Sequence, residues 1–225
     1  MEIQTKRANP TNYAADSVRK PHDIRYVVVH YTGNDGDSAR ANAQYFATAQ
    51  PGVSAHYFVD AQEIWNSVPE DCVAWHCGTR GAYYHPFCRN RNAIGVELCA
   101  YRDAKGRFCF REGTLDHAAA LLRELMTRYA IPVENVLRHY DVTHKCCPEP
   151  FVRDADAWVR FQKRLKGEED MTIYKTWADI PDWARDTVAK LTRKGFLRGD
   201  NGYLNLEHNA LRNLVINDRA GLYGV

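Results

Sequence analysis

The chain has 225 residues, of which 45% are hydrophobic and 26% are charged, and its formal net charge is +2. These values are ordinary for a globular protein with a buried core, and the length allows one medium domain and one small domain. A charge so close to neutral does not suggest nucleic-acid binding. The longest apolar run, over 26–30, is only as long as a strand, so no membrane insertion is expected.

The N-terminal twenty residues are polar and mixed in charge, without the apolar stretch of a secretory signal. We therefore expect a protein that is made in the cytoplasm. In the cytoplasm an odd number of cysteines does not predict a disulfide scaffold, so most of the cysteines are expected to be free thiols. The seven cysteines are Cys72, Cys77, Cys88, Cys99, Cys109, Cys146 and Cys147.

The first third of the chain predicts a strand, a helix and a hairpin after an irregular lead-in over 1–22. The β-branched run over 26–30 predicts a buried strand. Helical spacing of apolar residues follows over 38–49, whose first residue is a good N-cap. Two short strands over 54–59 and 64–68 are separated by a polar turn, which favours a hairpin.

The middle of the chain alternates strands with helices, which is typical of an α/β layer fold. In chain order it predicts a long loop over 79–92, a strand over 93–100, a hairpin over 101–110, the strongest helix over 114–129, a strand over 136–139 and a closing helix over 154–165.

A charged stretch over 167–172 contains a glycine and predicts a linker between a domain over 1–166 and a small all-α module over 173–225. The module is expected to hold helices over 181–194 and 206–220, the second with the preceding asparagine, Asn205, as N-cap. Two helices alone can bury only a little apolar surface. We therefore expect the apolar stripe that they share to need a partner. The stripe consists of Trp183, Val188, Leu191, Leu211, Leu214 and Val215.

We expect that partner to be a second copy of the module, because aliphatic stripes suit helix packing. The codons for residues 167–171 could also form a purine-rich ribosome-binding site before an internal start at Met171. A free C-terminal fragment would then associate with the full-length chain. Packing of the module against the domain over 1–166 and binding of the module to the cell wall are the alternatives.

Three residues of types that bind zinc occur where predicted strands end. His30 closes the first strand, His139 closes the strand over 136–139, and Cys147 follows in the next loop. Catalytic zinc takes three protein ligands and leaves one position open, which two imidazoles and a thiolate would satisfy. Spacing alone leaves open the simpler reading, in which the histidines are hydrogen-bonded surface groups.

Five sequence blocks in order resemble the type 2 N-acetylmuramoyl-L-alanine amidases, a family that includes phage amidase-type lysozymes and peptidoglycan recognition proteins. The most specific is the run over 138–148, which resembles the family signature His-x-Asp … Lys-x-Cys-Pro. The others are Val29-His30-Tyr31-Thr32, Val53-Ser54-Ala55-His56-Tyr57, Ala74-Trp75-His76-Cys77-Gly78 and Asn92-Ala93-Ile94-Gly95-Val96-Glu97.

The resemblance implies a mixed central sheet flanked by helices, with one zinc ion held by His30, His139 and Cys147. It implies hydrolysis of the amide bond between the lactyl group of N-acetylmuramic acid and L-alanine in peptidoglycan. Glu97 would act as general base and then as general acid, and Lys145 would stabilise the oxyanion.

The resemblance also assigns supporting residues. Asp141 would orient a ligand or its loop, and His56, His76 and Asn92 would bind substrate. Some relatives carry a catalytic tyrosine immediately before the histidine of the Ser-x-His motif, where this chain has Ala55. We therefore expect activity to depend on Glu97.

Two other functions stay open at this point. The chain could bind peptidoglycan without cutting it, although relatives of that kind typically lose the cysteine ligand that is present here. It could also be a zinc peptidase that acts within the stem peptide. The favoured context is a phage or prophage endolysin that a holin releases to the cell wall.

Overall fold

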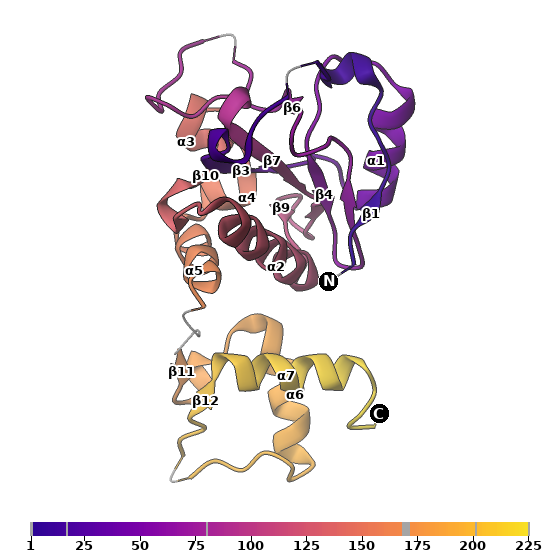
Figure 1. Cartoon of the computed structure of the whole chain (residues 1–225). Helices are drawn as coiled ribbons and strands as arrows, with labels where there is room; N and C mark the ends of the chain where they lie inside the picture. Colours follow the sequence, from indigo (N-terminus) through magenta and orange to yellow (C-terminus); the bar gives the residue numbers. More distant parts are fainter. Residues whose placement is uncertain (1, 17, 80, 168–171, 201, 225) are drawn as a thin grey trace. The chain divides into compact units, whose positions relative to one another are not determined.

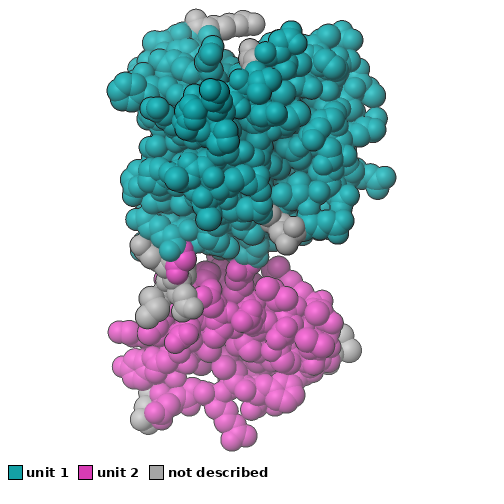
Figure 2. Space-filling model, in the orientation of Figure 1, with its two compact units in different colours: residues 1–166 teal, residues 167–225 magenta. Residues whose placement is uncertain are grey.

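The computed structural model separates the chain into two compact units, residues 1–166 and residues 167–225, shown in different colours in Figure 2. The residues that the structure describes are 2–16, 18–79, 81–167, 172–200 and 202–224.

The first unit is a layered α/β structure (Figure 1). Its strands are β1 (Gln4–Thr5), β2 (Tyr13–Ala14), β3 (Tyr26–Tyr31), β4 (Tyr57–Val59), β5 (Ile64–Asn66), β6 (Val73–Ala74), β7 (Ala93–Leu98), β8 (Tyr101–Arg102), β9 (Phe108–Cys109) and β10 (Val136–Arg138). Its α-helices are α1 (Ala39–Thr48), α2 (Glu112–Tyr129), α3 (His139–Thr143), α4 (Glu149–Arg153) and α5 (Ala155–Leu165). Short 3₁₀ turns cover Pro10–Asn12, Pro21–Asp23, Asn90–Asn92 and Val133–Asn135.

The central sheet has the strand order β1-β5-β4-β7-β3-β10. The pairs β4–β7, β7–β3 and β3–β10 are parallel, while β4 and β5 form the antiparallel hairpin that the sequence predicted. Because parallel strands end at the same edge of a sheet, residues at the carboxyl ends of β3, β7 and β10 gather there.

The two faces of the sheet have different roles because side chains alternate along each strand. Val27 and Val29 of β3 and Ile94 and Val96 of β7 point into the main core, against α2 and α5. The residues between them, such as Val28, face the opposite side, which α1, α3 and the loop over 78–89 cover. Because both faces of the sheet are covered, the sequences of its central strands are nearly continuous apolar runs.

Most predicted elements of this unit are present, and the differences are local. The N-terminal segment is not wholly irregular, because β1 pairs with β5 and β2 pairs with β6. The predicted strand over 136–139 ends at Arg138, and His139 instead opens α3. Helix α1 begins as expected, with the Ser38 hydroxyl accepting the Ala41 N–H. The prediction missed β6, α3 and α4, which are too short to show a periodicity.

The second unit contains α6 (Asp182–Arg193) and α7 (His208–Arg219), together with a 3₁₀ turn over Trp177–Asp179. It is not purely α-helical, because β11 (Ile173–Tyr174) pairs antiparallel with β12 (Leu206–Glu207). That pairing occupies the start of the predicted second helix, so α7 begins two residues later than predicted and Asn205 is not its N-cap. None of the described helices is long and apolar enough to cross a membrane.

The apolar stripe of the second unit packs largely against itself. Val188, Leu191, Leu211 and Val215 are at most 3% exposed in the interface between α6 and α7. The expectation that this stripe needs an outside partner is therefore wrong for its buried part. Trp183 is 43% exposed and stays at the surface.

Candidate active site

Strand register brings His30 and Glu97 side by side. The two residues are direct partners in the parallel β3–β7 pair, each near the carboxyl end of its strand. Both point to the face opposite the main core. His30 is only 2% exposed, whereas Glu97 is half-buried with its Oε2 atom buried. A histidine and a carboxylate therefore face the same space at one edge of the sheet.

Helix α3 and the loop after it supply two further groups. His139 is the first residue of α3 and is 2% exposed. The loop folds back because the Tyr140 N–H donates to the Cys147 carbonyl at 2.7 Å, which brings Cys147 next to the start of α3. The donor atoms of His30, His139 and Cys147 all lie within 4.8 Å of one another.

The geometry of these three groups fits a zinc ion. A nitrogen about 2.05 Å and a sulfur about 2.3 Å from a tetrahedral zinc lie about 3.6 Å apart. His30 Nδ1 and Cys147 Sγ are 3.7 Å apart. Both ring nitrogens of His139 are buried, and neither makes a hydrogen bond of normal geometry with the described residues, although the Gly78 backbone lies close enough to influence its pKa. Buried polar atoms are normally bonded, so an unpaired imidazole here is what a missing ligand would leave.

A second donor group shares His30 and combines it with His76 and Cys77. Here His76 Nδ1 lies 3.0 Å from His30 Nε2 and 3.0 Å from Cys77 Sγ. Both separations are shorter than the roughly 3.4 Å and 3.6 Å expected between donors on one tetrahedral zinc. Among the described residues, the group with His139 and Cys147 therefore fits zinc better.

Burial sets the protonation states of these three donor groups. It lowers the pKa of His139 to about 4 and holds the pKa of His30 well below its usual value, so both imidazoles are neutral and able to coordinate. Burial also raises the pKa of the Cys147 thiol to about 12. A thiolate at neutral pH therefore requires a compensating cation. The neighbouring Cys146 is exposed and lies outside the cluster.

Glu97 has the properties of a proton-transfer group. Burial raises the pKa of its carboxyl to about 8, and the positive charge of Lys145 opposes part of that shift. Lys145 also lowers the pKa values of His30 and His139, so its charge acts across the whole site. Its side chain is exposed, which leaves the ammonium group accessible to a bound molecule.

His76 lies behind His30. Its Nδ1 is 3.0 Å from His30 Nε2, which leaves His30 Nδ1 for the metal, and its ring lies against Gly95. A Cβ at position 95 would come within 2.5 Å of the His76 ring, so this strand position admits only glycine. His76 is 9% exposed and contacts His30, so its position favours a role in orienting the His30 ring, and its predicted role in substrate binding has no support.

His56 is completely buried, with 0% exposure. Its Nδ1 accepts the Gly95 N–H at 2.9 Å, and its Nε2 lies 3.2 Å from the Cys72 carbonyl and 2.8 Å from Arg19 Nη2. Neither nitrogen is left for a ligand, so the prediction that His56 binds substrate is not supported.

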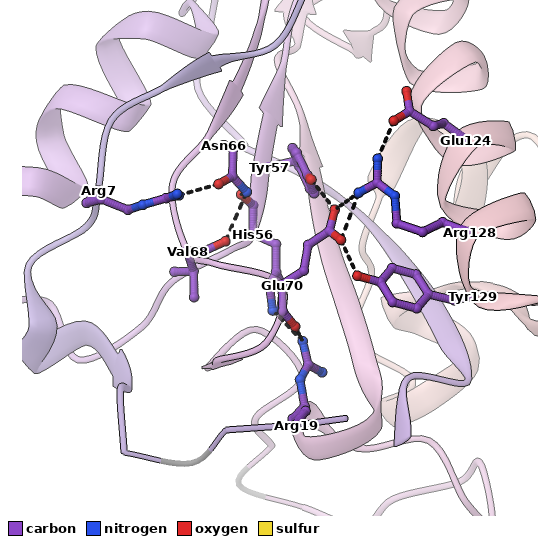
Figure 3. Close-up of polar contacts among 10 residues, drawn as sticks. All are labelled: Arg7, Arg19, His56, Tyr57, Asn66, Val68, Glu70, Glu124, Arg128 and Tyr129. Atoms are coloured by element: carbon purple, nitrogen blue, oxygen red, sulfur yellow. Dashed lines mark hydrogen bonds and ion pairs between the residues drawn. The ribbon is translucent and has the colours of Figure 1, made fainter. Parts of the chain in front are cut away.

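A polar network holds the surroundings of His56 in place (Figure 3). The Glu70 carboxylate accepts hydrogen bonds from the hydroxyls of Tyr57 and Tyr129 and from Arg128 Nη1, the last at 2.7 Å. The Glu70 carbonyl accepts from Arg19 Nη2 at 2.6 Å. These bonds join β4 to α2, which makes the network structural.

Asn92 lies at the opposite end of β7 from Glu97 and the donor group of His30, His139 and Cys147. It precedes β7, five residues before Glu97, and a strand of that length spans roughly 17 Å. Its Oδ1 accepts the Arg89 N–H at 2.8 Å and its Nδ2 donates to the Phe87 carbonyl at 3.0 Å. Asn92 therefore closes a loop, and the prediction of substrate binding is not supported.

Asp141 organises the start of α3. Its carboxylate accepts the Arg138 N–H at 2.8 Å and pairs with the Arg138 guanidinium at 2.7 Å. The helix that begins with His139 is thereby fixed at its first turn. This contact favours the predicted role of Asp141 in orienting a ligand or its loop, and that role stays a prediction. Sequence reasoning missed the site role of Gly95, although a glycine inside a strand is a recognised sign of close packing.

The family model described as N-acetylmuramoyl-L-alanine amidase matches residues 20–150. The chain is 32% identical over 181 residues to the N-acetylmuramoyl-L-alanine amidase CwlL of Bacillus licheniformis, covering 76% of this chain and 49% of that protein. It is 31% identical to the amidase BlyA of Bacillus subtilis, covering 75% and 48%. The chain thus spans about half the length of these relatives.

Solved structures show the same fold. A mutant of PlyL superimposes with a TM-score of 0.61 at 28% identity, covering 74% of this chain and 99% of that one. The catalytic domain of PlyG gives a TM-score of 0.61 at 30% identity, covering 75% and 95%. These domains confirm the expected mixed sheet with flanking helices.

Proposed function

We propose that this chain, which belongs to the N-acetylmuramoyl-L-alanine amidase family, cuts bacterial peptidoglycan between the lactyl group of N-acetylmuramic acid and L-alanine. The observation that carries the proposal is the buried cluster of His30, His139 and Cys147 beside Glu97 and Lys145. Donor groups of the types that bind zinc, a carboxyl with a raised pKa and a cation together support the proposal, because metal-assisted amide hydrolysis uses groups of these kinds.

One zinc ion would be held by His30, His139 and Cys147. When bound, zinc supplies Lewis acidity toward the amide carbonyl. Glu97 takes a proton from the attacking water and returns it to the leaving nitrogen of L-alanine, a task for which a pKa near the working pH is best suited. The ammonium group of Lys145 stabilises the negative charge that develops on the carbonyl oxygen.

The test is digestion of purified cell walls by the full chain, with mass analysis of the products. An amidase releases stem peptides with L-alanine amino termini and leaves intact glycan strands. Termini at other residues would instead identify a peptidase within the stem peptide. Binding to walls without any new amino termini would identify a non-catalytic binding protein.

The matched variants are Glu97→Gln and Cys146→Ser. Glu97→Gln keeps the size of the side chain and removes its ability to accept the proton, so product release should fall by on the order of a hundredfold or more. Cys146→Ser changes an exposed thiol next to the cluster and should retain activity. Normal activity in Glu97→Gln would contradict the proposed proton transfer.

We also propose that residues 173–225 mediate self-association. Although the stripe between α6 and α7 is buried, a depression of about 450 Å³ remains, lined by apolar groups that include Phe196 and Leu222. These two side chains are 67% and 69% exposed. Light scattering of the full chain should show an oligomer that Phe196→Ser with Leu222→Ser dissociates. A monomeric wild-type chain would favour wall binding by this unit.

The proposed internal start is tested separately. Met171 lies outside the residues that the structure describes. Expression of the native gene should give a second, small product that disappears when the Met171 codon is changed. Absence of that product from the native gene would leave association between full-length copies alone.

A further inference from the structure

The long loop over 78–89 carries exposed aromatic side chains that the catalytic cluster does not use. Tyr84 is 58% exposed and Tyr83 is 38% exposed. Large aromatic groups are normally buried, and exposed ones that lie close together mark binding surfaces. Their position relative to the catalytic residues decides what they could bind.

Backbone hydrogen bonds fix this loop against α3. The N–H groups of Tyr84 and His85 both point to the Val142 carbonyl, at 2.9 and 3.4 Å. Figure 1 shows the loop beside α3, the helix that begins with His139. Tyr84 is thus held within a few residues of a proposed zinc ligand.

Tyr84 belongs to a stack of parallel rings. The centroid of its ring lies 3.5 Å from that of the His144 ring, with an angle of 12° between the two ring planes. His144 in turn stacks with Tyr140 at 5.2 Å and 21°. His144 has a left-handed φ of 60° and immediately precedes Lys145, so the same turn places the stack and the ammonium group.

Tyr84 stays 58% exposed although the His144 ring stacks on it, so part of its ring surface is open to a flat ligand. Across the described part of the chain, the ring in contact with Tyr84 is that of His144, which covers one face. A further planar group would extend the stack on the other face. Sugar rings offer such a surface, because the C–H groups on one side of a pyranose form an apolar face that packs on an aromatic ring.

We propose that Tyr84 is a stacking site for an N-acetylhexosamine ring of the peptidoglycan glycan strand. The inference rests on the proposed function, which places the scissile amide at the metal cluster. That amide is joined to its sugar by only the short lactyl group, so a sugar ring must lie close beside the cluster. The ring stack next to Lys145 supplies a surface of the required kind at that place.

The experiment titrates the full chain with chitotetraose, a soluble oligomer of N-acetylglucosamine that contains no amide bond to L-alanine, by calorimetry. Tyr84→Ala should weaken binding roughly three- to tenfold, and Tyr84→Trp should retain it because the aromatic face is kept. The control Tyr45→Ala removes a ring that is 54% exposed on α1, and should bind as wild type does.

Two results would overturn the assignment. One is equal binding by wild type and Tyr84→Ala, including no binding by either. The other is an equal loss in Tyr45→Ala. A second measurement needs no variant: chitotetraose should shift the ring NMR signals of His144 in the wild-type protein, and unchanged signals would also count against the site.

The proposed function is tested by different products. Release of L-alanine termini from walls reports on amide cleavage, whereas chitotetraose binding reports on the sugar site alone. A protein that binds the oligomer through Tyr84 but releases no such termini would refute the amidase proposal and keep the sugar site.

Discussion

The replacement Gly95→Ala tests how the site is built, because it adds one methyl group at its most crowded point. The new Cβ would lie 2.5 Å from Cγ and 2.7 Å from Cδ2 of His76. Carbon atoms in contact prefer a separation of about 3.5 to 4.0 Å, so the overlap is roughly 1 Å. The φ of Gly95 is not left-handed, so the backbone itself accepts alanine and the effect is purely steric.

The His76 ring has little room to move away. Its Nδ1 is 3.0 Å from His30 Nε2, and the centroid of its ring is 5.8 Å from that of the His56 ring. Overpacking of this kind typically costs about 1 to 3 kcal/mol of folding free energy. The displaced ring would also release His30, so zinc affinity should fall together with stability.

The assay is urea unfolding of the zinc-loaded full chain, with zinc content measured in parallel. Gly81→Ala is the matched control, because among the described residues its Cβ would meet only the Thr79 hydroxyl, at 3.7 Å. In a His76→Ala background the clash is absent, so Gly95→Ala should then cost much less than in the wild type. An equal cost in both backgrounds would refute the steric account.

Three further predictions concern the metal cluster. Replacing His30, His139 or Cys147 by alanine should remove zinc and activity together, while Cys146→Ser keeps about one zinc per chain in metal analysis. Full zinc occupancy in Cys147→Ala would show that a different ligand set holds the metal. Zinc affinity should rise about tenfold per pH unit between pH 5.5 and 8. The Cys147 thiol, with a pKa raised to about 12, must lose a proton to bind zinc, while the histidines are already neutral. Competition with a chelator at several pH values measures this slope, and a flat profile would mean that no thiol proton is released. Glu97→Gln should keep its zinc content and unfolding midpoint near those of the wild type, while its turnover falls by on the order of a hundredfold. Counting new amino termini released from walls measures that turnover. A parallel loss of zinc would make Glu97 a ligand instead.

The sequence alone determined the strands and helices whose patterns are strong. The β-branched run at β3, the apolar spacing of α2 and the serine cap of α1 depend on local preferences, which a single sequence displays. The motif blocks also identified the donor set of His30, His139 and Cys147, because residue type and order are properties of the sequence. Zinc binding and catalysis by those residues stay predictions.

Only the tertiary structure decided what surrounds those donors. His56, His76 and Asn92 all stand in motif blocks, yet one is fully buried, one lies behind His30 and one lies beyond the far end of β7. A motif records which residues the fold uses without stating whether they face solvent, a ligand or the core. Burial depends on which segments pack above them.

The same reason explains why Gly95 and Tyr84 gave no clear signal in the sequence. Gly95 is required because His76, nineteen residues earlier, presses on its strand, and Tyr84 matters because α3 brings His144 against it. Both contacts join segments that are distant in the chain. Local patterns set the elements of this protein, whereas the three-dimensional packing between elements set the roles of these side chains.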